Sequence, residues 1–151
     1  MILLIDTADQ KKLWVGISEN KSVIAQMTVQ AEYRQAEKLM PTVTSLLRKT
    51  KLDLAELTGV AVVSGPGPFT ALRIGVVTAN ALGYALGLPV AGVLRAKAET
   101  PNELATSVSP RFAASRTSLG RAADLALKHG KVGAQVLPKY GKEPNITMSK
   151  K

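Results

Sequence analysis

The sequence predicts an α/β domain built on one mixed five-stranded sheet with flanking helices. Three observations carry this prediction: three strand-like segments joined by short links, a helical apolar pattern after them, and then a strand–loop–helix–strand run. Short links make the first three strands antiparallel neighbours, whereas a helix between two strands makes the last two strands parallel. A chain of 151 residues with 46% hydrophobic side chains can bury one core of this kind.

The three antiparallel strands are predicted at the N-terminal end. Residues 1–6 (MILLID) are an apolar run that ends in an acid, which is typical of a buried strand. Residues 12–19 and 22–29 alternate between apolar and polar side chains, as half-buried strands do. A polar turn at 7–11 and a two-residue turn at 20–21 separate the three strands.

The spacing of apolar residues becomes helical after Tyr33. A helix is predicted over 35–50, where residues at intervals of three and four form an apolar stripe: Leu39, Met40, Val43, Leu46 and Leu47. Pro41 lies inside this segment, so we expect it to kink the helix or to start a second one. Residues 52–57 predict a short helical turn.

The two parallel strands are predicted next. Residues 59–64 (GVAVVS) are small or β-branched throughout, which is typical of a parallel strand buried on both faces. A glycine–proline loop at 65–68 leads into a helix over 70–86, and residues 89–93 are the fifth strand. Residues 1–94 are therefore expected to form one lobe.

The chain beyond residue 94 is less regular. Residues 95–117 are polar and contain two prolines, which predicts a linker with a short helix at 101–106. Residues 118–130 predict a closing helix packed on the lobe, and residues 131–151 a basic extended tail.

Positive charge is concentrated toward the C-terminal end. The net charge is +9; residues 1–92 hold nine basic and seven acidic side chains, and residues 93–151 hold eleven and four. A basic end suggests an anionic partner such as RNA, and a solubilising tail explains it equally well. The candidate phosphate contacts are Lys139, Lys142, Lys150 and Lys151.

Several function classes are excluded by what the sequence lacks. It contains no cysteine, so disulfides, thiolate metal sites and thiol nucleophiles are absent, and it contains one histidine, His129. No metal site is therefore expected, and His129 is expected at a helix end beside Gly130. No apolar run reaches the ~18 residues of a membrane span without a charge or a Gly/Pro break. Residues 1–5 are too short for a signal peptide core, so we expect a cytoplasmic protein.

The segment GPGPFTALRIG at 65–75 is the most informative motif. Glycines after a buried strand allow close backbone approach, and the following helix start offers free N–H groups to an anion. No Lys-Ser/Thr pair follows the glycines, so the segment is not a Walker loop. Thr70 is a candidate helix cap. A phosphate site and a purely structural turn both remain open.

This segment closely resembles the G-P-G-S-F-T-G-[LV]-R-I-G signature of the bacterial TsaB (YeaZ) family. Supporting segments are MILLIDTAD, EYRQAEKLMPTVTSLL, GLPVAGV and LPKYGKEPNIT, which are similar to the family's opening strand, first helix, fifth strand and closing motif. The departures are Pro68 for serine, Ala71 for glycine, Gln35 near a usual histidine, and Gly141-Lys142 for Leu-Arg. The linker 95–117 stands where the family has a second subdomain, so the chain resembles a member without most of that subdomain.

The resemblance implies one lobe of the actin-like ATPase (RNase H-like) fold. It also implies an accessory subunit, not an enzyme, for threonylcarbamoyladenosine modification of the tRNA adenosine next to the anticodon. The implied partners are a TsaD-type catalytic subunit, a TsaE-type ATPase and a second copy through the same helices. ATP and Mg²⁺ would belong to the complex, and no cofactor is expected on this chain.

The position of Asp6 at the end of the first strand suits a phosphate or Mg²⁺ site in the actin-like fold. One carboxylate is a weak Mg²⁺ ligand by itself, and the alternative is that Asp6 caps the turn after the strand. The residues of a vestigial nucleotide or anion loop would be Asp6, Thr7, Gly65, Gly67, Thr70 and Arg73. Trp14, the single tryptophan, is expected to pack in the core or at an edge.

Small residues recur every four positions along the second helix, which predicts one flat face. Ala71, Gly75, Ala79 and Gly83 would let another helix approach closely, and the first helix would complete a partner interface through Leu39, Val43, Leu46 and Leu47. The alternative is that the small residues pack on the chain's own sheet. Because the second helix is apolar nearly all round, we expect one side to be covered by another protein.

Two other function classes stay open. A small nucleotide-binding enzyme of the same fold would need a second lobe to close over its ligand. A basic RNA-binding module would need aromatic stacking platforms, and the sequence has five Phe/Tyr and one Trp, mostly inside predicted elements.

Overall fold

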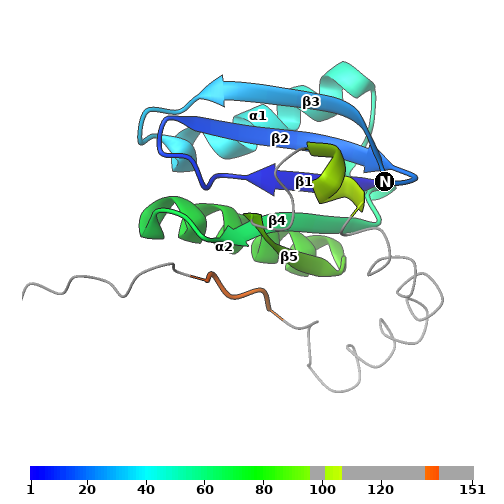
Figure 1. The fold of residues 1–151 in the computed structure, drawn as a ribbon. Coiled ribbons are helices and arrows are strands. Elements are labelled where there is room, and N and C mark those ends of the chain that lie inside the picture. Colours follow the sequence, from blue (N-terminus) through cyan, green and yellow to red (C-terminus); the bar gives the residue numbers. More distant parts are fainter. Residues whose placement is uncertain (96–100, 107–134, 140–151) are drawn as a thin grey trace, which may run out of the picture.

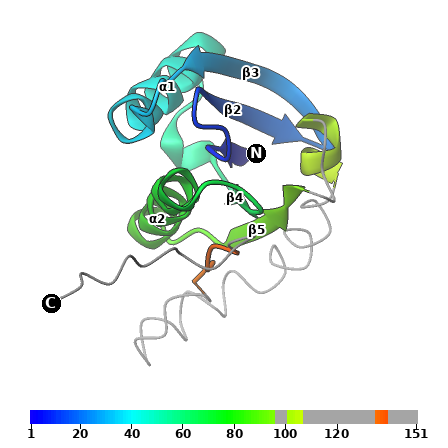
Figure 2. The same cartoon turned by 60° about the vertical axis from the view of Figure 1, so that its left-hand side comes forward.

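The computed structural model describes residues 1–95, 101–106 and 135–139. A five-stranded sheet in the order β3-β2-β1-β4-β5 carries two helices on one face (Figures 1 and 2). The elements are β1 (Ile2–Asp6), β2 (Lys12–Glu19), β3 (Ser22–Gln30), α1 (Gln35–Thr50), η1 (Leu54–Glu56), β4 (Gly59–Gly65), α2 (Phe69–Leu86) and β5 (Val90–Leu94). Residues 101–106 form a short helical segment on the opposite face of the sheet.

The pairing within the sheet confirms the predicted fold class. β1 pairs antiparallel with β2, and β2 pairs antiparallel with β3. β4 runs parallel to both β1 and β5, with α2 as the crossover between β4 and β5. The turn between β2 and β3 has positive φ at Asn20 and Lys21, the conformation that two-residue hairpin loops require.

The predicted elements agree with the observed ones to within one or two residues at each end, apart from the short turn at 52–57. That segment is the three-residue η1, which Asp53 and Glu56 close with a reciprocal capping box. The short helix predicted at 101–106 is present. The closing helix at 118–130 lies outside the described residues, and the division of the chain into linker, closing helix and tail stays a prediction.

Pro41 neither ends α1 nor starts a second helix, because α1 is one element from Gln35 to Thr50. A proline removes the hydrogen bond to the carbonyl four residues earlier, here that of Glu37. Both Pro41 and Glu37 are on the exposed side of the helix. Water can therefore satisfy that carbonyl, and the helix continues.

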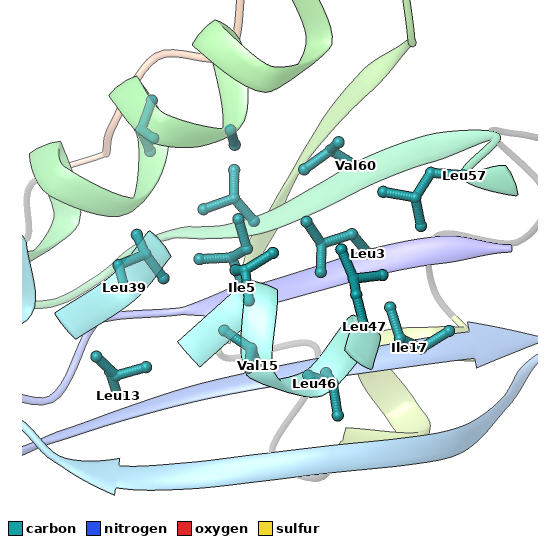
Figure 3. Close-up of a cluster of buried hydrophobic side chains, with 14 of the residues drawn as sticks. Leu3, Ile5, Leu13, Val15, Ile17, Leu39, Leu46, Leu47, Leu57 and Val60 are labelled. Carbon is teal, nitrogen blue, oxygen red and sulfur yellow. The ribbon is translucent and has the colours of Figure 1, made fainter. Parts of the chain in front are cut away.

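The main core lies between the sheet and the two helices (Figure 3). Alternate residues of the central strands, such as Leu3 and Ile5 of β1, point toward α1, and Leu39 and Leu46 point back from the helix. The other face of β1 and β4 packs on Leu104 and Ala105 of the 101–106 segment. β4 is buried along its whole length, as its run of small and β-branched residues predicts.

The small-residue face of α2 packs on the chain's own sheet. A Cβ atom on Gly75 would lie 2.4 Å from Thr7 Oγ1, and one on Gly83 would lie 2.2 Å from Val90 Cγ2, so neither position has room for a side chain. Ala71 and Ala79 are buried on the same face.

The expected partner interface is therefore corrected. All eight residues predicted for it are buried within this chain: Leu39, Val43, Leu46, Leu47, Ala71, Gly75, Ala79 and Gly83. In α1 these side chains are the stripe that covers the sheet. The alternative, packing on the chain's own sheet, is what the structure shows.

By length and composition, α2 is the one helix among the described residues that could cross a membrane. Its buried face lies on β1, β4 and β5 and forms part of the main core. About a third of the helix, 33%, is buried inside the lobe, and core helices of globular domains can have the same length and composition.

Residues 135–139 lie along α2 and the end of β4. The side-chain amide of Asn80 binds the backbone of Val136 twice: Nδ2 donates to the carbonyl (2.9 Å), and Oδ1 accepts from the N–H (3.1 Å). The Lys139 N–H donates to the Ser64 carbonyl at 2.6 Å. These bonds attach a segment that is distant in sequence to the lobe.

We predict that Gly75→Leu destabilises the fold, because the new side chain must displace Thr7 from beneath α2. The free energy of unfolding should fall by about 3 kcal/mol or more, at the upper end of the cost of overpacking a core. Ala85→Leu, on the exposed side of the same helix, should change it by less than about 0.5 kcal/mol. Urea unfolding followed by circular dichroism measures both. Equal stability of the two variants would show that α2 does not pack on Thr7.

Candidate functional site

The carboxyl ends of β1, β4 and β5 lie side by side at one end of the sheet. The candidate anion-loop residues lie at these strand ends or just beyond them. Asp6 ends β1, Gly65 ends β4 and Arg95 follows β5. In open α/β sheets, ligands commonly bind just beyond the carboxyl ends of the strands. A pocket of about 210 Å³ lies here, lined by Asp6, Asp9, Lys12, Leu13, Trp14, Thr28, Val63, Arg95, Pro101 and Leu104.

Both carboxylate oxygens of Asp6 have partners within the chain. Oδ1 accepts a hydrogen bond from the Ala8 N–H at 2.8 Å, and Oδ2 pairs with Arg95 Nη2 at 3.2 Å. The first bond is the turn cap that the sequence left open as the alternative. The described residues contain no group of three or more His, Cys, Asp or Glu side chains that could hold a metal ion.

Asp9 stabilises the same turn from the solvent side. Its Oδ1 accepts from the backbone N–H groups of Lys11 (2.8 Å) and Lys12 (3.3 Å). The Lys11 bond is the main cause that lowers the pKa of the Asp9 carboxyl. Gln35, which stands near the family's histidine, is buried and donates from Nε2 to the carbonyls of Asp9 and Gln10, so it joins the start of α1 to this turn.

Thr7 has a structural role in the contact between β1 and α2. Its side chain is fully buried, and its hydroxyl donates to the Ala71 carbonyl of α2 at 2.7 Å. A hydroxyl held in this way is directed into the protein and not toward a ligand. Thr7 therefore joins β1 to α2.

The glycine loop is closed on one side by residue 139. Gly65 has φ +141°, and a Cβ atom there would lie 2.0 Å from the Lys139 carbonyl oxygen. That oxygen is a hydrogen-bond acceptor, whereas a phosphate requires donors. Gly67 packs less closely, with 3.1 Å from an added Cβ to the Ala8 Cβ. Close packing against the Lys139 backbone accounts for Gly65.

The structure corrects the expected cap of α2. The N-cap residue is Pro68, without a side-chain cap hydrogen bond, and Thr70 is exposed one position inside the helix. Arg73 lies over the ring of Phe69, 5.0 Å from its centroid, a cation–π contact on the surface. The residues predicted for one anion loop therefore lie in two places. Asp6 lies in the turn after β1, and Arg73 lies on the surface of α2 against Phe69.

The outer face of α2 carries exposed apolar side chains. Phe69 is 40% exposed, Val77 63% and Tyr84 70%, and Leu137 of the neighbouring segment is 73% exposed. A groove of about 710 Å³ runs between α2 and residues 135–138 along this face. We define the outer face of α2 as Phe69, Arg73, Val77 and Tyr84. Large exposed aromatic and arginine side chains are typical of protein–protein contact surfaces.

Sequence reasoning did not identify this face or the role of Arg95. The apolar residues of α2 were visible, but their distribution all round the helix did not show which side faces outward. Arg95 carried no local signal, because its partner Asp6 is 89 positions away in sequence. Tyr33 is exposed just before α1, and Arg34 pairs with Glu37. His129, Lys142, Lys150 and Lys151 lie outside the described residues.

Trp14 is partly buried and packs against the core on the side of the sheet that carries Leu104, one of the two positions expected for it. Its indole lies over Gly16, where an added Cβ would be 2.5 Å from the ring, and Nε1 donates to Gln26 Oε1 at 2.9 Å. The ring forms part of the pocket wall beside Asp6.

The chain is similar to known proteins in both sequence and fold. Residues 26–127 match the family model described as "TsaD: tRNA N6-adenosine threonylcarbamoyltransferase". The chain is 32% identical over 117 residues to the tRNA threonylcarbamoyladenosine biosynthesis protein TsaB of Bacillus subtilis, which covers 76% of this chain and 51% of that protein. It is 42% identical over 95 residues to an uncharacterized protein of Mycobacterium tuberculosis, covering 61% and 44%.

Solved structures agree. YeaZ from Pseudomonas aeruginosa superposes with a TM-score of 0.55 at 27% identity, covering 62% of this chain and 42% of that one. The chain spans about half the length of the curated relatives it matches. The match to the family model, the identity with the Bacillus subtilis protein and the similar fold of YeaZ together show that the chain belongs to the TsaB (YeaZ) family of tRNA threonylcarbamoyladenosine biosynthesis proteins.

Proposed function

We propose that this chain is a non-catalytic scaffold subunit that binds a TsaD-type catalytic subunit in threonylcarbamoyladenosine modification of tRNA. The observation that carries the proposal is the exposed outer face of α2. Exposed side chains of this size and type on one helix indicate a surface that another protein covers.

The internal contacts at the carboxyl edge support a role without catalysis. Asp6, Thr7 and Gly65 each have a partner from the chain itself at the place where a ligand would bind. The Arg95 guanidinium also neutralises the Asp6 carboxylate, which weakens its attraction for Mg²⁺. ATP and Mg²⁺ would then bind elsewhere in the complex, on the catalytic subunit or on a TsaE-type ATPase.

The similarity to catalytic relatives supports the choice of partner. Over 63 residues the chain is 38% identical to a tRNA N6-adenosine threonylcarbamoyltransferase of Geotalea uraniireducens. Two proteins that share a lobe can pair through corresponding helices, as two copies of one protein do. The outer face of α2 would be this chain's side of such a pair.

We expect Val77→Asp to weaken binding of the catalytic subunit at least tenfold, because it places an unpaired charge in an apolar contact. Tyr84→Ala should weaken it by a similar factor through lost contact area. Ile24→Asp is the matched control, since it replaces a half-exposed apolar residue on β3, away from α2. Isothermal titration calorimetry of each folded variant gives the affinities. Equal binding by Val77→Asp and Ile24→Asp would place the interface elsewhere.

The alternative of a nucleotide-binding enzyme makes an opposite prediction for Asp6. We expect no ATP hydrolysis above background with Mg²⁺, and Asp6→Ala should lower the free energy of unfolding by about 1 kcal/mol through loss of the turn cap. Phosphate release and thermal unfolding test the two effects. Mg²⁺-dependent turnover that Asp6→Ala abolishes would contradict a scaffold role.

The basic tail is proposed to contact tRNA phosphates. Lys139, the one tail lysine in the described part of the chain, has an exposed side chain while its backbone is attached to β4. Removal of residues 140–151 should lower tRNA affinity and flatten its dependence on salt, because fewer counterions are released on binding. Filter binding at several salt concentrations measures both quantities. Unchanged affinity would leave the tail as a solubilising segment.

A further inference from the structure

A short segment distant in sequence, residues 135–139, lies against the lobe in a way that the proposed function does not use. In Figure 2 it is the orange trace beside β5 and α2. Val136 and Pro138 are partly buried, whereas Leu137 between them is 73% exposed. This alternation is typical of an extended segment that has one side on the protein and the other side facing outward.

The lobe provides space for the 135–139 segment at two glycines. A Cβ atom added to Gly92 of β5 would lie 2.6 Å from Val136 Cγ1, so Val136 occupies the space that a side chain would need. Gly65 at the end of β4 leaves the same kind of space for the backbone of Lys139. Both strands therefore lack a side chain where the segment crosses them.

Asn80 of α2 holds the middle of the segment. Its carboxamide has a donor and an acceptor, as a peptide group does, and both bind the backbone of Val136. Asn80 lies one turn after Val77 and one turn before Tyr84, so these residues are neighbours on the helix surface. The side of the helix that holds the segment therefore borders the outer face of α2.

The segment adds a second wall to the outer face of α2. The groove of about 710 Å³ between them has Val77 and Tyr84 on the helix side and Leu137 on the segment side. Exposed apolar surface on two elements that line one groove is typical of a site that a partner fills. Arg73 is the one charged residue among the described residues that line the groove. A partner that fits the groove therefore carries apolar side chains and a carboxylate opposite Arg73.

We propose that the 135–139 segment is the second wall of the binding site for the catalytic subunit, and that Asn80 is the positioning residue that holds this wall against α2. The inference rests on the proposed function, because it takes the same partner. It adds that the contact is not confined to one helix. Leu137 contacts the partner directly, whereas Asn80 acts through the segment.

Isothermal titration calorimetry of the 151-residue chain with a TsaD-type catalytic subunit tests the second wall. We expect Leu137→Asp to weaken binding about tenfold, because it places a charge in an apolar contact. Ile24→Asp makes a similar change on β3, away from the groove, and should leave the affinity unchanged. Leu137 and Ile24 are both exposed, so both variants should fold, which circular dichroism checks.

Asn80→Ala tests the positioning role with two measurements. Hydrogen exchange of the Val136 N–H in the free chain should become faster because its acceptor is lost, while exchange in the core strands stays the same. Binding should weaken about fivefold, and Leu137→Asp should cost less affinity in this variant than in the unchanged chain, because the two residues act through one contact. Thr44→Ala, on the exposed side of α1, should change neither quantity.

The possible results separate this inference from the proposed function. A complex that Val77→Asp weakens and Leu137→Asp does not would overturn the second wall and leave the proposed function standing. Additive effects of Asn80→Ala and Leu137→Asp, or an unchanged affinity of Asn80→Ala, would overturn the positioning role. An unchanged chain that binds no catalytic subunit would contradict the proposed function itself, and this inference with it.

Discussion

The contact between Thr7 and α2 determines how the lobe is arranged. β1 is the central strand, with β2 antiparallel on one side and β4 parallel on the other, and Thr7 follows it directly. The Thr7 hydroxyl binds the Ala71 carbonyl, and the absence of a side chain at Gly75 lets the helix lie on it. Because this contact fixes the rotation of α2, it turns the small residues inward and leaves Val77 and Tyr84 exposed.

The same packing shows what the residues that resemble a phosphate loop in sequence do at the carboxyl ends of the strands. The glycines, the acid and the threonine of a phosphate loop are all present. Each of them serves a contact within the chain: Asp6 with Ala8 and Arg95, Gly65 with the Lys139 carbonyl, and Thr7 with α2. Residue types that can bind an anion do so only when their donors face an open space.

Local patterns in the sequence determined the elements and their order. The change from period-two to helical spacing located the strands and α1, because each pattern depends on neighbours within one or two turns. The short links determined the antiparallel pairs, and the strand–helix–strand run determined the parallel ones. The family motif at 65–75 identified the family for the same reason, since it is continuous in sequence.

Only the tertiary structure decided which faces are inside and which residues meet. In sequence, the stripe of small residues fits the chain's own sheet or a partner helix equally well: Ala71, Gly75, Ala79 and Gly83. Because α2 is apolar nearly all round, its periodicity does not show which of the two the stripe packs on. Thr7 and Val90 show that the stripe packs within the chain, because they lie directly beneath Gly75 and Gly83. The pairs Asp6–Arg95 and Asn80–Val136 join residues 89 and 56 positions apart, a separation at which no local pattern carries information about contact.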